Sequence, residues 1–197
     1  MNILFVCDPV ASFHIEKDST FTMMREAQLR GHAVWVCGTD ALFWQSGGQV
    51  SARMHQLKLT GHCVDWFTVT AEANRSLCSL DAIVMRKDPP FDNEYFYATH
   101  LLSQAEREGA RVFNSPQALR EHPEKLSLME FAAFAAPTLV TRDAKAIREF
   151  HALHHDIILK PLDGMGGMGI FRVKADGLNL GSIIETLNHN GAVSVMV

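Results

Sequence analysis

The stretch "ILKPLDGMGGMGIFRV", residues 157–172, decides how the second half of the chain is interpreted. Four glycines fall within six residues, directly after an apolar run that ends in Lys160 and Pro161. Glycine loses more backbone freedom on folding than any other residue, so this loop carries a high entropic cost and needs a reason. The residues "IFRV" that follow are apolar, aromatic or β-branched at most positions, which is typical of a strand. We therefore predict two strands joined by a glycine-rich loop.

Two common phosphate-binding motifs do not fit this loop. Gly164, Gly166 and Gly169 match the spacing G-x-G-x-x-G. That fingerprint indicates dinucleotide binding only where the glycines open a helix, because the pyrophosphate meets the helix N-terminus. A strand is predicted here instead. The P-loop pattern also fails, since no Gly-Lys-Ser/Thr follows the glycines.

A glycine-rich hairpin can cover phosphate groups with its backbone N–H groups, as the corresponding hairpin of protein kinases does. Lys160 lies on the strand that leads into the loop, and its ammonium is a compact charge suited to phosphate oxygens. The alternative is a flexible surface hairpin in which Lys160 extends to solvent. A two-residue Asn-Gly or Asp-Gly turn makes such a hairpin with fewer glycines, so the residues favour the phosphate-binding interpretation.

The first part of the chain alternates strands and helices. Apolar runs predict strands at residues 2–7, 33–38, 80–86 and 110–114, and helices are expected at 18–32 and 93–109. Asp18 or Ser19 can cap the first helix. This order predicts a parallel sheet of an α/β fold. Residues 47–60 and 64–70 are expected to form an edge hairpin.

The second part begins near residue 120, where we place a boundary between domains 1–120 and 121–197. A helical connector is expected at 114–134. Strands are then predicted at 137–143, 156–162, 169–176 and 192–197, and helices at 143–155 and 180–191.

Composition excludes several classes of function. Eighteen basic and 22 acidic residues give a net charge of −4, and no run of Lys or Arg stands out, so nucleic acid is not an expected partner. No apolar run is long enough to span a membrane, and the N-terminus lacks the features of a signal peptide. The four cysteines contain no C-x-x-C pair, and Cys7 and Cys37 lie in apolar runs. A reducing cytoplasm is therefore expected.

The sequence resembles the ATP-grasp ligases, and its motifs are most similar to those of the bacterial glutathione synthetases. Besides "ILKPLDGMGG", the similar segments are "IEKDSTFTMMREAQLRGH" (15–32), "MRKDPPFDNEYFYATHLL" (85–102) and "VFNSPQALREHPEKL" (112–126). They occur in the family's order and cover nearly the whole chain. The resemblance implies an N-terminal parallel-sheet domain, of the Rossmann-like pre-ATP-grasp type, followed by the first part of an ATP-grasp fold.

The resemblance also implies a reaction and its ligands. ATP phosphorylates γ-glutamylcysteine, glycine attacks the acyl phosphate, and glutathione, ADP and phosphate are released. By position, Lys125 and Lys160 match the family's two ATP-contacting lysines, and Lys160 is expected to act in phosphoryl transfer. The family's small phosphate-covering loop matches Gly164, Met165, Gly166 and Gly167. The N-terminal sheet is expected to help hold the peptide substrate and to support a homo-oligomer interface.

Substrate contacts are expected at the end of the strand at 80–86, because parallel α/β sheets bind ligands at the carboxyl ends of their strands. Arg86 and Asp88 are candidates there, and Arg86 can clamp a carboxylate with two hydrogen bonds. The alternative is that "RKDPPFD" is a rigid polar turn. Lys17 and Ser12 are weaker candidates, since "EKDST" also reads as a helix cap.

The sequence offers no metal ligands. His151, His154 and His155 share a helical face, but no carboxylate or cysteine completes a set, and surface histidines are the preferred interpretation. In the family, the adenine-binding hinge follows the strand at 192–197, and the Mg²⁺ ligands (Mn²⁺ is an alternative) come later. We therefore expect the chain to be C-terminally truncated and inactive alone. Another ATP-grasp carboxylate-amine ligase and a non-catalytic nucleotide-binding module remain as alternatives.

Overall fold

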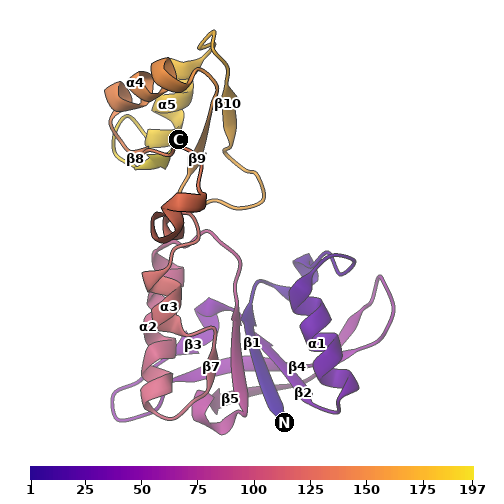
Figure 1. Cartoon of the computed structure of the whole chain (residues 1–197). Helices are drawn as coiled ribbons and strands as arrows, with labels where there is room; N and C mark the ends of the chain where they lie inside the picture. Colours follow the sequence, from indigo (N-terminus) through magenta and orange to yellow (C-terminus); the bar gives the residue numbers. More distant parts are fainter. The chain divides into compact units, whose positions relative to one another are not determined.

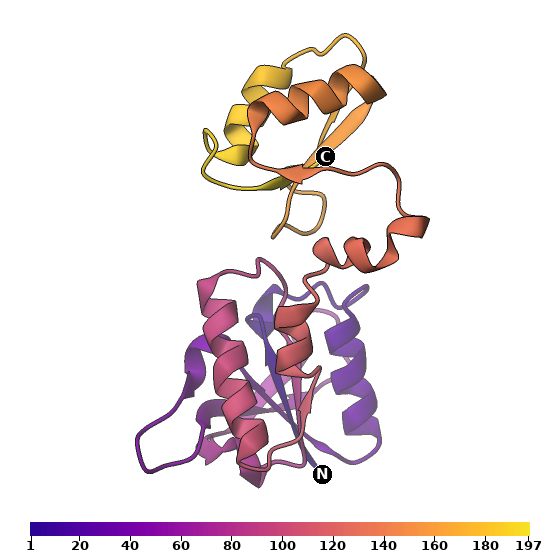
Figure 2. The ribbon, with the colours of Figure 1, turned by 60° about the vertical axis from the view of Figure 1, so that its left-hand side comes forward.

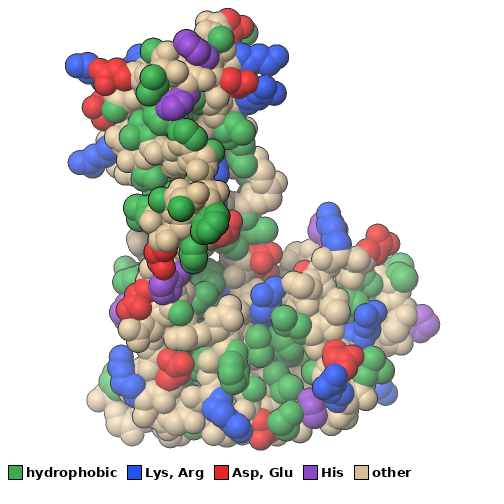
Figure 3. Space-filling view, in the orientation of Figure 1, with side chains coloured by type: hydrophobic (Ala, Val, Ile, Leu, Met, Phe, Trp, Pro, Cys, Tyr) green, Lys and Arg blue, Asp and Glu red, His purple; other side chains and the backbone are tan.

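The computed structural model describes residues 1–197, which divide into two compact units, Met1–Glu121 and His122–Val197. Each unit has its own sheet and its own apolar core. Figures 1 and 2 show the helices and strands of each unit from two directions. In Figure 3, side chains of both charge signs are spread over the visible surface of each unit. None of the helices combines the length and the hydropathy that a membrane span requires.

The N-terminal unit is built on four parallel strands. Their order across the sheet is β2-β1-β6-β7, and the bounds are β1 Asn2–Cys7, β2 Ala33–Cys37, β6 Ala82–Arg86 and β7 Val112–Phe113. The predicted alternation is confirmed: α1 (Ser19–Leu29) connects β1 to β2, and α2 (Asn93–Arg107) connects β6 to β7. Asp18, not Ser19, caps α1, because its carboxylate accepts the N–H of Phe21 at 2.9 Å.

Three further strands extend this sheet in the antiparallel sense. The long hairpin of β4 (Ser51–Leu59) and β5 (Phe67–Ser76) is joined to the parallel strands through β2, and β3 (Leu42–Phe43) pairs with the start of β4. The hairpin was expected at 47–60 and 64–70, so the prediction ended β5 six residues too early. Residues Ala71–Ser76 contain few strand-forming residue types, and cross-strand pairing with β4 outweighs that local preference.

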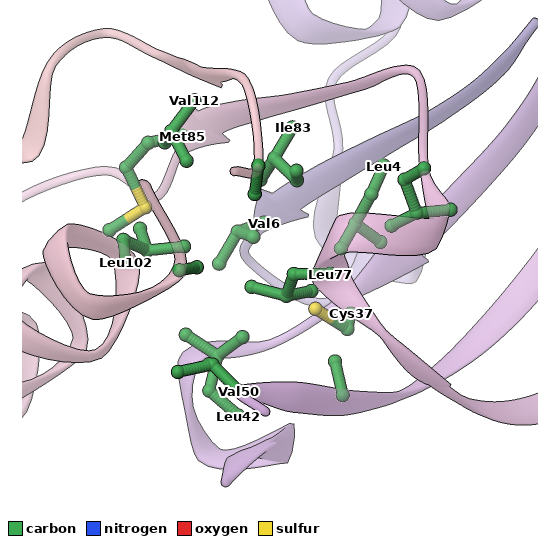
Figure 4. Packing of buried hydrophobic residues seen from close by; sticks show 14 of the residues in the cluster. Leu4, Val6, Cys37, Leu42, Val50, Leu77, Ile83, Met85, Leu102 and Val112 are labelled. Atoms are coloured by element: carbon green, nitrogen blue, oxygen red, sulfur yellow. The ribbon is translucent and has the colours of Figure 1, made fainter. Parts of the chain in front are cut away.

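Helices cover both faces of the N-terminal sheet, as the alternation of side chains along β1 requires. Leu4 and Val6 pack into one buried cluster, with residues of α2, whereas Phe5 and Cys7 pack into another, with residues of α1. Figure 4 shows the first cluster, where Leu102 of α2 lies near Met85 and Val112. The carboxyl ends of β1, β2 and β6 therefore reach one edge of a sheet that is buried on both faces.

The connector of the chain is helical, as predicted, with α3 at Pro116–Glu121 and the 3-10 segment η4 at Leu126–Phe134. Short 3-10 turns, which were not predicted, also follow three strands of the N-terminal unit, at η1 Val10–Ser12, η2 Thr39–Ala41 and η3 Leu77–Ser79.

The C-terminal unit has a four-stranded antiparallel sheet in the order β10-β9-β11-β8. The strands are β8 Val140–Thr141, β9 Ile157–Pro161, β10 Phe171–Val173 and β11 Val195–Met196, and the helices are α4 Ala144–His154 and α5 Leu180–Asn188. All six predicted elements exist, but each is shorter than predicted, and the difference is largest for β8, β10 and β11. The two helices share a buried cluster with the sheet, which leaves Ile158 and Lys160 of β9 outside it.

Candidate functional site

The glycine loop joins β9 to β10, which pair antiparallel, so the predicted strand–loop–strand hairpin is present. Gly166 and Gly167 have φ values of +62° and +81°, a region of backbone conformation that other residues rarely adopt. A Cβ atom at either position would meet no other atom of the chain within 4 Å. The backbone conformation therefore requires glycine at these two positions, and the space beside them is open to a ligand.

A cavity of about 410 Å³ lies under this loop. All six residues that were predicted to contact ATP line it, and they are Lys125, Lys160, Gly164, Met165, Gly166 and Gly167. The ammonium of Lys125 donates a hydrogen bond to the carbonyl of Gly164. The ammonium of Lys160 takes part in none of the ion pairs of the chain, so its charge is available to an anion. The structure thus brings two cations and a glycine-rich loop into one cavity, which Glu124 and Met168 also line.

A second cavity, also of about 410 Å³, shares Lys160 with the first. Its lining is largely apolar and includes Ile158, Met196 and Phe150. From the sequence, the base-binding part of a nucleotide site was expected outside this chain, and this cavity was not predicted. The usable signal was the alternation along β9, because Ile157 and Leu159 are buried while Ile158 and Lys160 point to the other face. An apolar cavity next to a lysine can accept a planar base.

The four residues predicted to bind substrate lie in the N-terminal unit. Arg86 ends β6, and its guanidinium donates to the hydroxyls of Ser19 at 2.8 Å and Thr20 at 3.0 Å, at the start of α1. The hydroxyl of Ser12 donates to the carbonyl of Pro9 at 2.7 Å, and Lys17 is exposed. Asp88 follows Arg86 in the loop after β6. Arg86 is thus held by the helix start, while Lys17 remains open to solvent.

Asp8 is a residue of this region that the sequence analysis did not single out. Its Oδ1 lies 2.7 Å from Nζ of Lys87, and its Oδ2 accepts the backbone N–H of Asp88 at 2.8 Å. One carboxylate thereby joins the loop after β1 to the loop after β6. Its place directly after the first buried strand was the available signal, because the carboxyl ends of neighbouring parallel strands meet at one edge.

The thiols of the N-terminal sheet are not nucleophiles at neutral pH. Burial, followed by the charges of Asp8 and Asp18, raises the pKa of Cys7 to about 12. Burial also raises the pKa of Cys37. Since the thiolate is the reactive form, both side chains act as small buried apolar groups.

The histidine interpretation was wrong in part. His151 is buried at 8% exposure, and its Nε2 lies 2.8 Å from the carbonyl oxygen of Lys174, so it is a core residue and not a surface one. In the whole chain, no group of three or more His, Cys, Asp or Glu side chains is placed to hold a metal ion.

The fold has recognisable counterparts among solved structures. D-alanyl-alanine synthetase A from Vibrio cholerae O1 biovar eltor is similar with a TM-score of 0.62 and 16% identity, over 100% of this chain and 58% of that chain. A RimK domain protein ATP-grasp from Sphaerobacter thermophilus is similar with a TM-score of 0.58 and 15% identity, over 100% of this chain and 62% of that chain. At such identities the likeness concerns the fold alone; a family model supplies the class, an ATP-grasp protein.

Two family models match the chain and identify its family within the ATP-grasp class. The model for "Prokaryotic glutathione synthetase, N-terminal domain" matches residues 1–120, and that for "Prokaryotic glutathione synthetase, ATP-grasp domain" matches residues 124–197. The chain belongs to the prokaryotic glutathione synthetase family, so the predicted family and fold class are confirmed. A glutathione synthetase of Ralstonia nicotianae is 57% identical over 196 residues, which is 100% of this chain and 60% of the relative. The chain spans about 60% of the length of the curated relatives it matches.

Proposed function

We propose that this chain serves an ATP-dependent ligase that joins γ-glutamylcysteine and glycine to form glutathione. One observation carries the proposal: the two lysines and four loop residues that the family resemblance assigns to ATP all line one cavity. Membership of the prokaryotic glutathione synthetase family supports the same reaction.

In this proposal the nucleotide occupies the two cavities that meet at Lys160. The base lies in the apolar cavity beside Ile158 and Met196. The phosphates lie under the loop, where the space beside Gly166 and Gly167 is open. Lys125 and Lys160 supply positive charge to the phosphate oxygens, and Lys160 remains beside them during phosphoryl transfer.

The proposed reaction has two steps. A carboxylate oxygen of γ-glutamylcysteine attacks the γ-phosphorus of ATP, which forms an acyl phosphate and releases ADP. The amine of glycine then attacks the acyl carbon, loses a proton, and displaces inorganic phosphate to leave the peptide bond. The lysines of this chain contribute to the first step, because charge on the transferring phosphoryl group must be stabilised away from water.

We propose Mg²⁺, with Mn²⁺ as an alternative, as the divalent ion of the reaction, but the residues of this chain do not fit it. Magnesium binds carboxylates beside substrate phosphates, and no group of three potential ligands exists in the chain. No step is therefore assigned to the metal.

The substrate-binding roles of Arg86, Asp88, Lys17 and Ser12 remain part of the proposal. The Nε and Nη2 atoms of Arg86 donate hydrogen bonds to the hydroxyls of Thr20 and Ser19 in α1. These bonds orient the guanidinium and leave Nη1 for a substrate carboxylate. We also propose a cytoplasmic homo-oligomer that acts on small molecules and has no nucleic acid partner.

Calorimetry of the 197-residue chain with ATP tests the nucleotide site directly. We expect saturable binding of one ATP, and a chain that binds no ATP would contradict the proposal. A coupled assay with ATP, Mg²⁺, γ-glutamylcysteine and glycine is expected to show no turnover by this chain, because its residues form no metal site. In a protein of the full family length, γ-glutamylcysteine with glycine should be preferred over other acid–amine pairs.

A further inference from the structure

The glycine loop carries two methionines, and both line the cavity that contains the two lysines. Met168 is 68% exposed, which is the largest exposed fraction among the nine methionines of the chain. Met165 is half-buried, and four methionines elsewhere are buried in the apolar cores. Met168 therefore combines the most accessible thioether of the chain with a place in the proposed nucleotide site.

The two methionines flank a tight turn at the tip of the loop. The N–H of Met168 donates to the carbonyl of Met165 at 3.1 Å, and Gly166 and Gly167 between them both have positive φ. This is the pattern of a type I′ turn, which brings its first and fourth residues close together. The turn therefore places both thioethers at the same end of the hairpin.

The base of the loop is packed against Pro161. A Cβ at Gly164 would lie 2.9 Å from Cγ of Pro161, and a Cβ at Gly169 would lie 3.3 Å from Cγ and Cδ of the same ring. Met168 directly precedes the second of these close approaches. Its backbone is thus held at the cavity wall, while its side chain stays open to solvent.

An accessible thioether reacts with peroxides to form methionine sulfoxide. The sulfur lone pair attacks one oxygen of hydrogen peroxide, an S–O bond forms, and the O–O bond breaks. The departing hydroxide takes the proton from the new S–OH group and leaves as water, so the sulfur is oxidised and the peroxide is reduced. The product is a polar side chain in place of a flexible apolar one.

A sulfoxide at position 168 changes the cavity in a direction that is unfavourable to ATP. Lys160 takes part in none of the ion pairs, so its ammonium can donate to the sulfoxide oxygen. A donor used in this way is lost to phosphate, and the added oxygen also occupies space in the cavity. Met129 is exposed to a similar degree, 64%, but lines neither cavity of the proposed nucleotide site. Its oxidation should leave ATP binding unaffected.

We propose that Met168 is an oxidative modification site, at which a hydroperoxide forms a sulfoxide that weakens ATP binding. The proposal rests on the proposed nucleotide site and adds a means by which oxidants control it. Methionine sulfoxide reductases convert the sulfoxide back to the thioether, so the change is reversible.

Calorimetry of the 197-residue chain with ATP, before and after treatment with hydrogen peroxide, tests the proposal. Dithiothreitol follows the treatment, because it reverses sulfenic acid at the exposed Cys63 and leaves sulfoxides in place. Peptide mass spectrometry locates each added oxygen atom. We expect an added oxygen at Met168 and an ATP affinity lowered at least about fivefold, and methionine sulfoxide reductases should restore both.

Two variants assign the effect to one residue. Met168→Leu removes the oxidisable sulfur and keeps an apolar side chain, and Met129→Leu is the matched control. Each variant is compared with its own untreated sample, so an effect of leucine itself on ATP affinity cancels. Oxidised Met129→Leu should lose ATP affinity as the unsubstituted chain does, whereas oxidised Met168→Leu should keep most of it.

Three results overturn the proposal while the nucleotide site stands. They are a Met168 that peroxide leaves unmodified, an unchanged ATP affinity after Met168 is oxidised, and an equal loss of affinity in oxidised Met168→Leu. An untreated chain that binds no ATP is a different result, since it contradicts the nucleotide site and this proposal with it.

Discussion

The ammonium of Lys125 donates a hydrogen bond to the carbonyl of Gly164, although 39 residues separate them in the sequence. This contact joins the residue before η4 to the first glycine of the glycine loop. It holds a positive charge at the cavity wall, and it engages one carbonyl of the loop.

Replacing Lys125 by methionine keeps most of the side-chain volume and removes this charge and hydrogen bond. We expect ATP affinity to fall about tenfold, because a hydrogen bond from a charged group contributes about 1.5–3 kcal/mol. Amide hydrogen exchange in residues 164–167 should also become faster. If the exchange rates and the ATP affinity of the variant both equal those of the unsubstituted chain, Lys125 supports neither the loop nor the nucleotide.

Lys160→Ala removes the ammonium that both cavities share. ATP binding should weaken by about tenfold or more, because a charged contact to phosphate is lost. Lys145→Ala is the control, since Lys145 is an exposed lysine of the same unit that lies 3.7 Å from Glu149. Equal ATP dissociation constants for the two variants, measured by calorimetry, would remove Lys160 from the site.

The glycine hairpin could be predicted because its information is local. A strand-like run, four glycines and a second strand-like run define β9, the loop and β10. The strand after Gly169 excluded the dinucleotide-binding motif, and the lack of Gly-Lys-Ser/Thr excluded the P-loop. The strand at Ala71–Ser76 could not be predicted, because it is stabilised by pairing with β4 and not by its own residue types.

The contacts of Asp8 and the cavity beside Ile158 depend on residues that are distant in sequence. Asp8 and Asp88 are 80 residues apart, and only the parallel pairing of β1 with β6 brings them together. The apolar cavity similarly needs Pro137 and Met196 beside β9. Periodicity identifies the outward face of β9, but it does not identify what lies opposite that face.

Substitutions of the neighbouring residues Ile158 and Leu159 should affect different properties. We expect the change at Ile158 to weaken nucleotide binding and the change at Leu159 to lower stability. Leu159 is fully buried, so Leu159→Ala should reduce the free energy of unfolding by about 2–5 kcal/mol. Ile158 is 50% exposed and lines the apolar cavity, so Ile158→Ala should reduce ATP affinity more than stability. Urea unfolding and ATP calorimetry of both variants check this, and a larger stability loss for Ile158→Ala would contradict the assignment of the two faces.

Stability should fall at alkaline pH partly because of Cys7. Its pKa rises from 9.0 to about 12 on folding, so below pH 9 both states keep the thiol proton and its contribution is complete. Above pH 9 the unfolded chain loses this proton first, and the free energy of unfolding falls by up to about 1.4 kcal/mol per pH unit until the folded thiol also ionises. Urea unfolding near pH 8 and near pH 10 should show a smaller decline for Cys7→Ala than for Cys63→Ala, whose thiol is exposed. Equal declines would exclude Cys7 as a cause.

Gly167→Val tests whether the glycine loop serves a ligand or only a turn. Gly167 has φ +81°, and a β-branched residue fits this conformation badly, so the loop backbone must shift. The loop contributes little to the buried core, and the thermal midpoint should therefore change little, while ATP affinity should fall about tenfold because the shifted backbone alters the cavity that Gly167 lines. Gly61→Val is the matched control, since Gly61 has φ +84° and open space around it but lies in the N-terminal unit. It imposes a comparable backbone strain, so any effect on ATP binding that the two variants share is not specific to the site. A large drop in midpoint with normal ATP binding for Gly167→Val would instead identify the loop as a structural turn.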